Sequence, residues 1–71
     1  MGKFTYTEAQ AIQQIVLAKG GIISRPDLVN LLRARTGAMM PWWLKMYLQQ
    51  LVSSGLFEMS EDGKTFKALE A

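Results

Sequence analysis

Residues 41–55 read PWWLKMYLQQLVSSG, and this segment constrains the fold more strongly than any other. Three leucines recur in it at i, i+4 and i+7: Leu44, Leu48 and Leu51. On a helix this spacing places them along one side, where they can be buried together. Pro41 suits a first helical position, and Gly55 suits a left-handed cap after the last turn. The segment therefore predicts a helix over residues 41–54 that packs one leucine stripe against a partner.

The opposite side of this predicted helix is polar and aromatic. It carries Trp42, Lys45, Met46, Gln49, Gln50 and Ser53. Side chains of these kinds can stack, donate and accept hydrogen bonds, and hold a positive charge, so we interpret the segment as a recognition helix whose outer face contacts another macromolecule. For the lysine and the two glutamines, the alternative is an ordinary solvated helix face.

Trp42 and Trp43 are adjacent, so on a helix they point about 100° apart and cannot both face one core. We expect one of the two rings to be exposed. Three interpretations of that ring remain open from the sequence: a contact with a protein partner, a contact with nucleic acid, or packing over a neighbouring helix.

The composition excludes several classes of protein. The chain has 71 residues, no cysteine and no histidine, with a formal net charge of +2. A chain of this length forms one domain, over residues 1–71, with a marginal core that oligomerisation would stabilise. The commonest zinc ligand and general base is absent, and no serine or carboxylate has a partner that would activate it, so we expect neither an enzyme nor a bound cofactor.

No apolar run approaches the roughly 20 residues that span a bilayer, so we expect no membrane segment and a cytoplasmic protein. The charges are unevenly distributed. Five cations precede position 36 against two anions, Glu8 and Asp27; the cations are Lys3, Lys19, Arg25, Arg33 and Arg35. The second half is slightly acidic, so charge alone gives nucleic-acid binding only weak support.

Two further helices precede residue 41. Thr7 and Gln10 have the spacing of a capping box, and Gly20-Gly21 ends the following apolar pattern, which predicts a helix over residues 8–18. The pair Ile22-Ile23 then reads as a strand of two or three residues.

The next helix is predicted over residues 25–35. Ser24 is its N-cap, Asp27 is the acidic residue three positions later, and Thr36-Gly37 ends the pattern. Its buried stripe consists of Leu28, Leu31 and Leu32. Only residues 38–40 separate it from the Pro41 helix, so the two are joined by a tight turn, as in a helix-turn-helix.

Beyond Gly55 the apolar period changes from 3.6 to 2, which predicts a β-hairpin over residues 56–69. A two-residue type I′ turn at Asp62-Gly63 would pair Glu61 with Lys64, Ser60 with Thr65, Met59 with Phe66, Glu58 with Lys67, and Phe57 with Ala68. Phe57, Met59, Phe66 and Ala68 then share one buried face. The alternative, a helix over residues 60–69, would place Gly63 in its interior and bury no complete stripe.

The order of these elements and three local segments resemble the winged helix-turn-helix superfamily. The segments are ISRPDLV (residues 23–29), LQQLVSSGLFE (residues 48–58) and the dipeptide Asp62-Gly63, which resembles a wing tip. The resemblance covers nearly the whole chain. In its small size the chain is similar to winged-helix regulators of archaea, their viruses and bacteria. It implies an α+β fold with three helices, a short strand and a C-terminal hairpin wing.

The resemblance also implies a function in which the third helix enters the major groove of double-stranded DNA and the wing contacts the backbone. Carried onto this sequence, the DNA-binding residues would be Arg25, Arg33, Arg35, Trp42, Trp43, Lys45, Met46, Gln49, Gln50, Lys64 and Lys67. Two features depart from the pattern. The predicted recognition helix has no arginine, and the wing tip carries Glu61 and Asp62, which phosphates would repel.

Two functions follow as expectations. The first is a DNA-binding transcriptional regulator, acting as a homodimer because one module this small buries little DNA surface. The second is a protein-interaction module that docks onto a larger assembly through Trp42, Met46 and the wing, which would account for the weak charge and the acidic tip.

Overall fold

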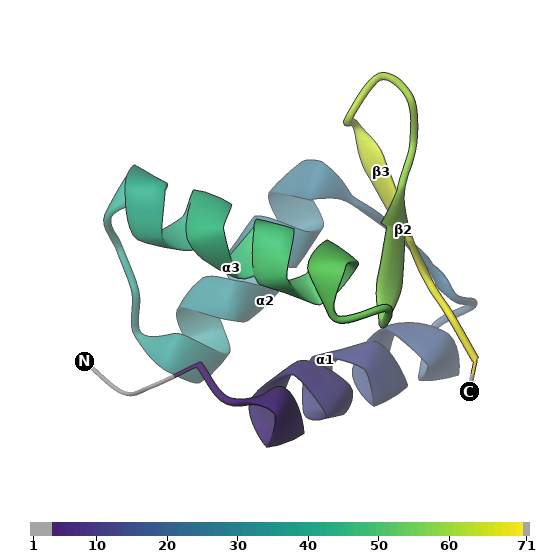
Figure 1. Cartoon of the computed structure of the whole chain (residues 1–71), viewed down its shortest axis with the longest axis horizontal. Coiled ribbons are helices and arrows are strands. Elements are labelled where there is room, and N and C mark those ends of the chain that lie inside the picture. The colour runs from purple at the N-terminus through teal and green to yellow at the C-terminus, as the bar shows by residue number, and fades with distance from the viewer. Residues whose placement is uncertain (1–3, 71) are drawn as a thin grey trace.

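The computed structural model describes residues 4–70, which form three helices and one three-stranded antiparallel sheet (Figure 1). In chain order the elements are α1 (Tyr6–Ala18), β1 (Ile22–Ser24), α2 (Arg25–Thr36), α3 (Pro41–Ser53), β2 (Phe57–Met59) and β3 (Thr65–Ala68). This α+β arrangement has the types and order of elements expected from the sequence. The predicted boundaries differ from the observed ones by one or two residues, most at the start of α1.

The sheet has the strand order β1-β3-β2. Its β2–β3 register pairs Phe57 with Ala68, Glu58 with Lys67 and Met59 with Phe66, so these three predicted pairs are confirmed. The alternative of a helix over residues 60–69 is wrong, because β3 occupies its centre. On its other side β3 pairs with β1, which brings Ile23 opposite Phe66.

The hairpin turn is not the predicted type I′ turn. That turn needs a positive φ at both central residues, Asp62 and Gly63. Among residues 4–70 only glycines have a positive φ, so Gly63, at +71°, meets the requirement and Asp62 does not. Instead, the Gly63 N–H donates to the Ser60 carbonyl at 3.0 Å, and the Ser60 N–H donates to the Thr65 carbonyl at 3.0 Å. Residues 61–64 therefore form the loop, and a glycine is needed only at its third position.

The helix caps follow from short-range sequence, with one correction. Thr5, not Thr7, caps α1, because its hydroxyl accepts from the Glu8 N–H at 3.2 Å. Thr5 and Glu8 have the Thr-x-x-Glu spacing of a capping box, and this signal outweighs the pair that starts at Thr7. Ser24 caps α2 as predicted, accepting from the Asp27 N–H at 3.3 Å.

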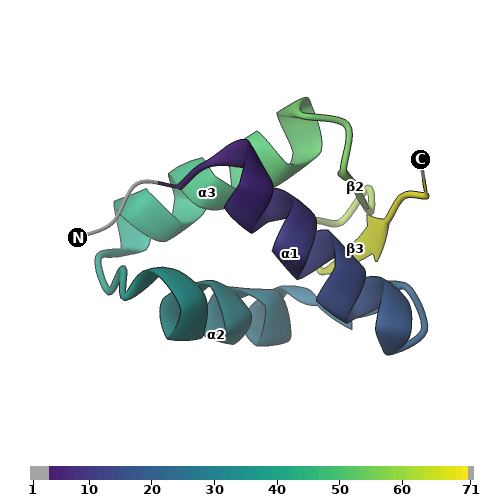
Figure 2. The same cartoon turned by 90° about the horizontal axis from the view of Figure 1, so that it is seen from below.

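The core lies among the three helices and the inner face of the sheet, with α1 lying across the space between α2 and α3 (Figure 2). Its buried side chains are Ala9, Ile12, Val16, Leu28, Leu32, Ala38, Leu44, Tyr47, Leu48, Leu51, Leu56, Phe57, Phe66 and Ala68. Met59 lies on the same face of the sheet as Phe66, as predicted, but it is 47% exposed and is not part of the buried core. β2 ends at Met59, so this residue extends beyond the core that covers Phe57.

Candidate nucleic-acid interface

α3 presents one face to the core and the opposite face to solvent. The buried face carries Leu44, Tyr47, Leu48 and Leu51. Trp42, Lys45, Met46, Gln49, Gln50 and Ser53 are all exposed, as the sequence predicted. Tyr47 was not predicted to be buried. Its ring stacks on Phe4, with centroids 4.6 Å apart, and this contact with the chain before α1 is not visible in the local pattern.

The two tryptophans differ in burial as expected. Trp42 is 53% exposed, whereas Trp43 is partly buried against the core. Their rings stack with centroids 4.4 Å apart and an angle of 26° between planes. Trp43 also lies 6.0 Å from the ring of Tyr47. The exposed indole of Trp42 is thus held in a fixed direction, because it stacks on Trp43, which itself packs against the core.

A hollow with a volume of about 310 Å³ lies between α3 and the hairpin. Leu48, Val52, Met59 and Phe66 give it an apolar floor, while Arg25, Lys45, Gln49 and Ser53 supply its polar groups. No acidic residue lines it. The site therefore offers positive charge and hydrogen-bond donors beside apolar surface.

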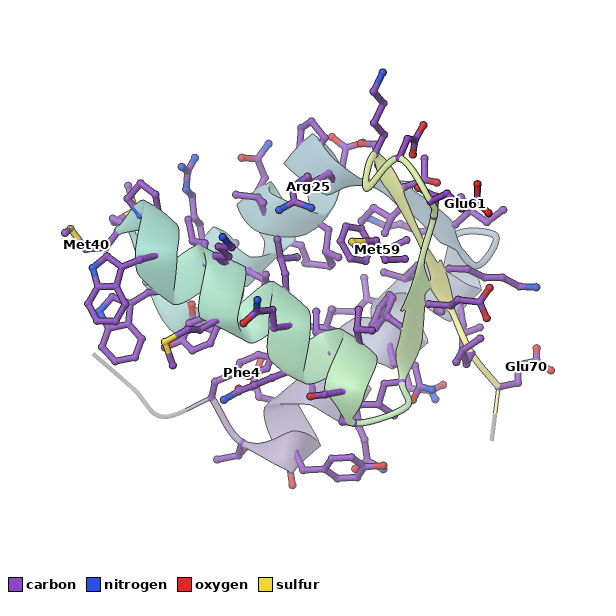
Figure 3. The ribbon with its side chains drawn as sticks, turned by 45° about the horizontal axis from the view of Figure 1, so that its top comes forward. Phe4, Arg25, Met40, Met59, Glu61 and Glu70 are labelled. Carbon is purple, nitrogen blue, oxygen red and sulfur yellow. The ribbon has the colours of Figure 1, made fainter. Side chains whose placement is uncertain are left out.

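Arg25 connects α2 to the hairpin loop at the edge of this hollow (Figure 3). Its Nη1 donates to the Gly63 carbonyl at 3.2 Å, and its backbone N–H donates to the Lys64 carbonyl at 2.8 Å. The guanidinium also lies over the ring of Phe66, 5.9 Å from the centroid. These contacts fix both the loop and the cation, so Arg25 has a structural role that its position in the sequence did not reveal.

Arg33 joins the same group of cations. A second hollow, of about 290 Å³ between α2 and α3, is lined by Arg25, Arg33 and Lys45 together with apolar residues. Arg33 and Lys45 are exposed, and Arg25 is half-buried. The structure thus brings three of the predicted site residues into one basic groove, which we define as Arg25, Arg33 and Lys45.

Arg35 lies outside the basic groove. Its Nε pairs with a carboxylate oxygen of Glu8 on α1, and this hydrogen bond, with the negative charge of Glu8, raises the pKa of Arg35 above its ordinary value. Because a carboxylate already neutralises its charge, Arg35 is poorly suited to bind a phosphate without losing that partner.

Gln49 and Gln50 point to different sides of α3. Gln49 lines the hollow beside Lys45 and the hairpin. Gln50 instead lines a separate hollow against the start of α1, next to Phe4 and Thr5. The sequence suggested either glutamine as a contact for a base, and the structure associates only Gln49 with the cations.

The hairpin carries charges of both signs. Lys67 faces Glu58 across the β2–β3 ladder, and Glu61, Asp62 and Lys64 lie in the exposed loop. Asp62 holds the loop, because its Oδ1 accepts from the Ser60 hydroxyl at 2.6 Å and from the Lys64 N–H at 3.0 Å. The first of these bonds, then the second, lowers the pKa of Asp62 below its ordinary value.

Exposed apolar side chains gather near the start of α3, at the end of the molecule opposite the hairpin (Figure 3). They are Met39, Met40, Trp42 and Met46. Met39, in the turn before α3, is the most exposed of the four at 68%. In this apolar tip, defined as those four residues, Trp42 and Met46 lie on the same helix as Lys45 and Gln49, and Met39 and Met40 precede it.

Within residues 4–70, no three acidic, histidine or cysteine side chains are grouped so that they could hold a metal ion. In the same part of the chain, none of the helices has the length and apolar character needed to cross a membrane. Comparison with protein-family models, with curated proteins and with solved structures gave no match.

Proposed function

We propose that this chain is a winged helix-turn-helix protein that binds double-stranded DNA through α3. The observation that supports this most strongly is the convergence of Arg25, Arg33 and Lys45 along one groove beside the exposed face of α3. The order of elements and the β1-β3-β2 sheet are compatible with a winged helix. In this proposal α3 is the recognition helix and the β2–β3 hairpin is the wing.

The exposed residues of α3 suit the chemistry of the major groove, which is about 12 Å wide and admits a helix. Gln49 can make paired hydrogen bonds to adenine, and Lys45 can reach guanine or a phosphate. Met46 can contact the methyl group of thymine. Each of these side chains is exposed on the outer face of α3, so none requires the core to open.

The cations beside α3 would position the helix through the DNA backbone. Arg33 and Lys45 are exposed, and Arg25 is fixed by its bond to Gly63 at 3.2 Å. Contacts of arginine and lysine with phosphates set register and orientation but carry no sequence information. In this proposal Lys64 is the wing cation nearest to the backbone, whereas Lys67 is already opposite Glu58.

We further propose that the protein acts as a homodimer and regulates transcription in association with the nucleoid. Residues 4–70 extend over 28 × 25 × 20 Å, so one copy spans less than one turn of DNA, which is about 34 Å long. Specific protein–DNA complexes usually bury about 1,000 to 2,500 Å² of protein surface, which two copies supply more readily than one.

A selection from randomised duplexes, followed by a salt titration of the selected duplex, tests the proposal. If each copy neutralises three to five phosphates, the logarithm of affinity falls with the logarithm of salt concentration with a slope of about −3 to −5 per copy. A selection that enriches no sequence, together with a flat salt response, would refute DNA binding.

The apolar tip favours a second candidate, a protein-interaction module. Met39, Met40, Trp42 and Met46 form a surface without charge, and exposed aromatic and methionine side chains are enriched at protein interfaces. The two candidates share Trp42 and Met46, but the basic groove contributes little to an apolar contact and therefore distinguishes DNA binding from protein binding.

Charge reversal of the basic groove separates the two candidates. The double variant Arg33→Glu, Lys45→Glu should lose DNA retention if the first proposal holds, and should retain a protein partner if the second holds. Arg35 is less suitable for this test, since a glutamate there would face Glu8 and destabilise the contact between α1 and α2. The control is the double variant Gln10→Glu, Gln14→Glu, which adds two negative charges at exposed positions of α1 that line neither hollow beside α3.

A further inference from the structure

A separate hollow lies on the side of the molecule away from the outer face of α3. Its volume is about 480 Å³, and its walls come from the end of α1, from β1 and from the first half of α2. Five aliphatic side chains line it: Ile15, Val16, Ile22, Ile23 and Leu31. No residue of α3 takes part, so a molecule bound here would leave the outer face of α3 free.

β1 forms one edge of the sheet at this hollow. The Gly21 carbonyl accepts from the Ala68 N–H at 2.7 Å, and the Arg25 N–H donates to the Lys64 carbonyl at 2.8 Å. Backbone groups alternate in direction along an antiparallel strand, so those of Ile22 and Ser24 point away from β3. Ile22 is 65% exposed, and an exposed apolar edge strand is a site at which a strand of another chain can pair.

Two opposite charges lie at the same hollow. Lys19 follows α1, and Asp27 is in the first turn of α2. Within residues 4–70 the ion pair that forms joins Arg35 to Glu8, so neither of these charges is neutralised inside the chain. Lys19 precedes Ile23 by four positions and Asp27 follows it by four. The hollow is therefore lined by one cation from the end of α1 and one anion from α2.

From this arrangement we propose that a second copy of the chain covers this surface, with β1 antiparallel to β1 of the partner copy. Pairing centred on Ile23 puts Ile22 opposite the partner's Ser24, so that the outward backbone groups of both strands are satisfied. The exposed Ile22 side chain packs into the hollow of the other copy, and each Lys19 faces the partner's Asp27. The same surface on both copies forms the contact, as a two-fold dimer requires.

Charge complementarity identifies the partner as a second copy. A strongly acidic or strongly basic protein would leave Lys19 or Asp27 facing a like charge, which costs affinity. A surface that carries one charge of each sign can be complementary to itself, with the cation of each copy against the anion of the other. The inference rests on the proposed function in one respect: it identifies the surface through which the proposed homodimer forms. Dimerisation can be measured without DNA, so the two proposals are tested separately.

Light scattering and sedimentation equilibrium of the whole chain test the proposal. The wild type should be a dimer at micromolar concentration. Ile22→Glu should be a folded monomer, because Ile22 contributes to the partner's hollow and little to its own core. The matched control is Met59→Glu, which adds the same charge at a residue of comparable exposure on β2, at the other edge of the sheet, and should remain dimeric.

Two charge variants test the symmetry. Lys19→Glu and Asp27→Lys should each raise the dissociation constant by about tenfold or more, because each brings like charges together twice. An equimolar mixture of the two should recover the dimer, since every contact then joins opposite charges. Circular dichroism of each variant verifies that α2 still forms after Asp27 is replaced.

Any of three results would overturn the proposed surface. They are a wild type that stays monomeric to about 100 μM, an Ile22→Glu variant as dimeric as Met59→Glu, and a mixture of Lys19→Glu with Asp27→Lys that does not recover the dimer. The outcomes for DNA are separate. A dimer sensitive to Ile22→Glu that binds no duplex refutes the proposed function and retains this surface. A monomer that binds duplex through α3 refutes this dimer surface and retains DNA binding.

Discussion

Gly55 is the residue at which α3 gives way to the hairpin. Its φ is +81°, in the left-handed region, and a Cβ added there would meet no atom within 4 Å. The glycine is therefore required by backbone conformation and not by lack of space. Residues with a side chain pay about 1–2 kcal/mol to adopt this conformation.

Gly55→Ala should accordingly lower the free energy of unfolding by about 1–2 kcal/mol, measured by urea denaturation. Ser54→Ala, at the preceding residue with a φ of −78°, is the control and should have a smaller effect. Equal stability of Gly55→Ala and the wild type would show that the chain leaves α3 by a different route.

Asp62 makes the stability of the loop depend on pH. The bonds from the Ser60 hydroxyl and the Lys64 N–H lower its pKa in the folded state. A group whose pKa is lower when folded stabilises the fold above its unfolded pKa, about 3.9, and that contribution is lost as the pH falls through the folded value.

Asp62→Asn should therefore reduce the loss of stability between pH 7 and pH 2, because asparagine does not titrate. Thermal unfolding of both proteins across this range measures the difference. Identical pH dependence in the two proteins would mean that the carboxylate does not hold the loop in solution.

Some residue roles could be predicted from the sequence and others could not. The exposure of Lys45 and Gln49 follows from their positions relative to the leucine stripe. The pairing of Arg35 with Glu8 does not, since 27 positions separate them and many other pairings were equally compatible with the pattern. The contact of Arg25 with Gly63 could not be predicted either, because it results from the strand order.

α3 provides a matched pair of variants at neighbouring positions. Gln49 lies beside Lys45 and the hairpin, whereas Gln50 lies against α1. If Gln49 reads an adenine, Gln49→Ala should weaken binding to the selected duplex by about 1–3 kcal/mol and relax specificity at one base pair. Gln50→Ala should change it by less than about 0.5 kcal/mol. Fluorescence anisotropy measures both, and equal effects would contradict the assignment.

The hairpin provides a test of the wing. Arg25 holds its loop beside the hollow that Lys45 also lines, so in our proposal the loop approaches the DNA backbone. Glu61→Lys should raise affinity and steepen the salt slope by about one unit. Glu70→Lys makes the same charge change near the C-terminus, away from the loop (Figure 3), and should leave the slope unchanged. If both variants behave alike, the hairpin does not contact DNA specifically.

The elements themselves were largely predictable because short-range signals specify them. Alternating residues fixed the pairing of β2 with β3, and Ser24 with Asp27 fixed the start of α2. The errors occurred where two local signals competed. Thr5 and Thr7 both begin capping sequences, and Asp62-Gly63 is typical of a type I′ turn although the loop adopts negative φ at Asp62.

The two candidate surfaces of the molecule have no lining residue in common. The outer face of α3 and the basic groove contribute to one surface, and the end of α1, β1 and the start of α2 form the other. In the proposed dimer, two copies of α3 would therefore remain available to DNA. From the sequence we expected a homodimer but could not predict its surface. The edge of β1 is exposed as a result of the β1–β3 pairing, which joins segments far apart in the chain.

The central claim is that the outer face of α3 binds DNA. Backbone amide and indole N–H chemical shifts of the ¹⁵N-labelled chain, recorded while the selected duplex is added, test it directly. We predict that the largest changes occur at the Trp42 indole and at the amides of residues 42–50, with smaller changes at Arg25 and Arg33. Changes confined to α1 and β1, with the Trp42 indole unaffected, would contradict the claim.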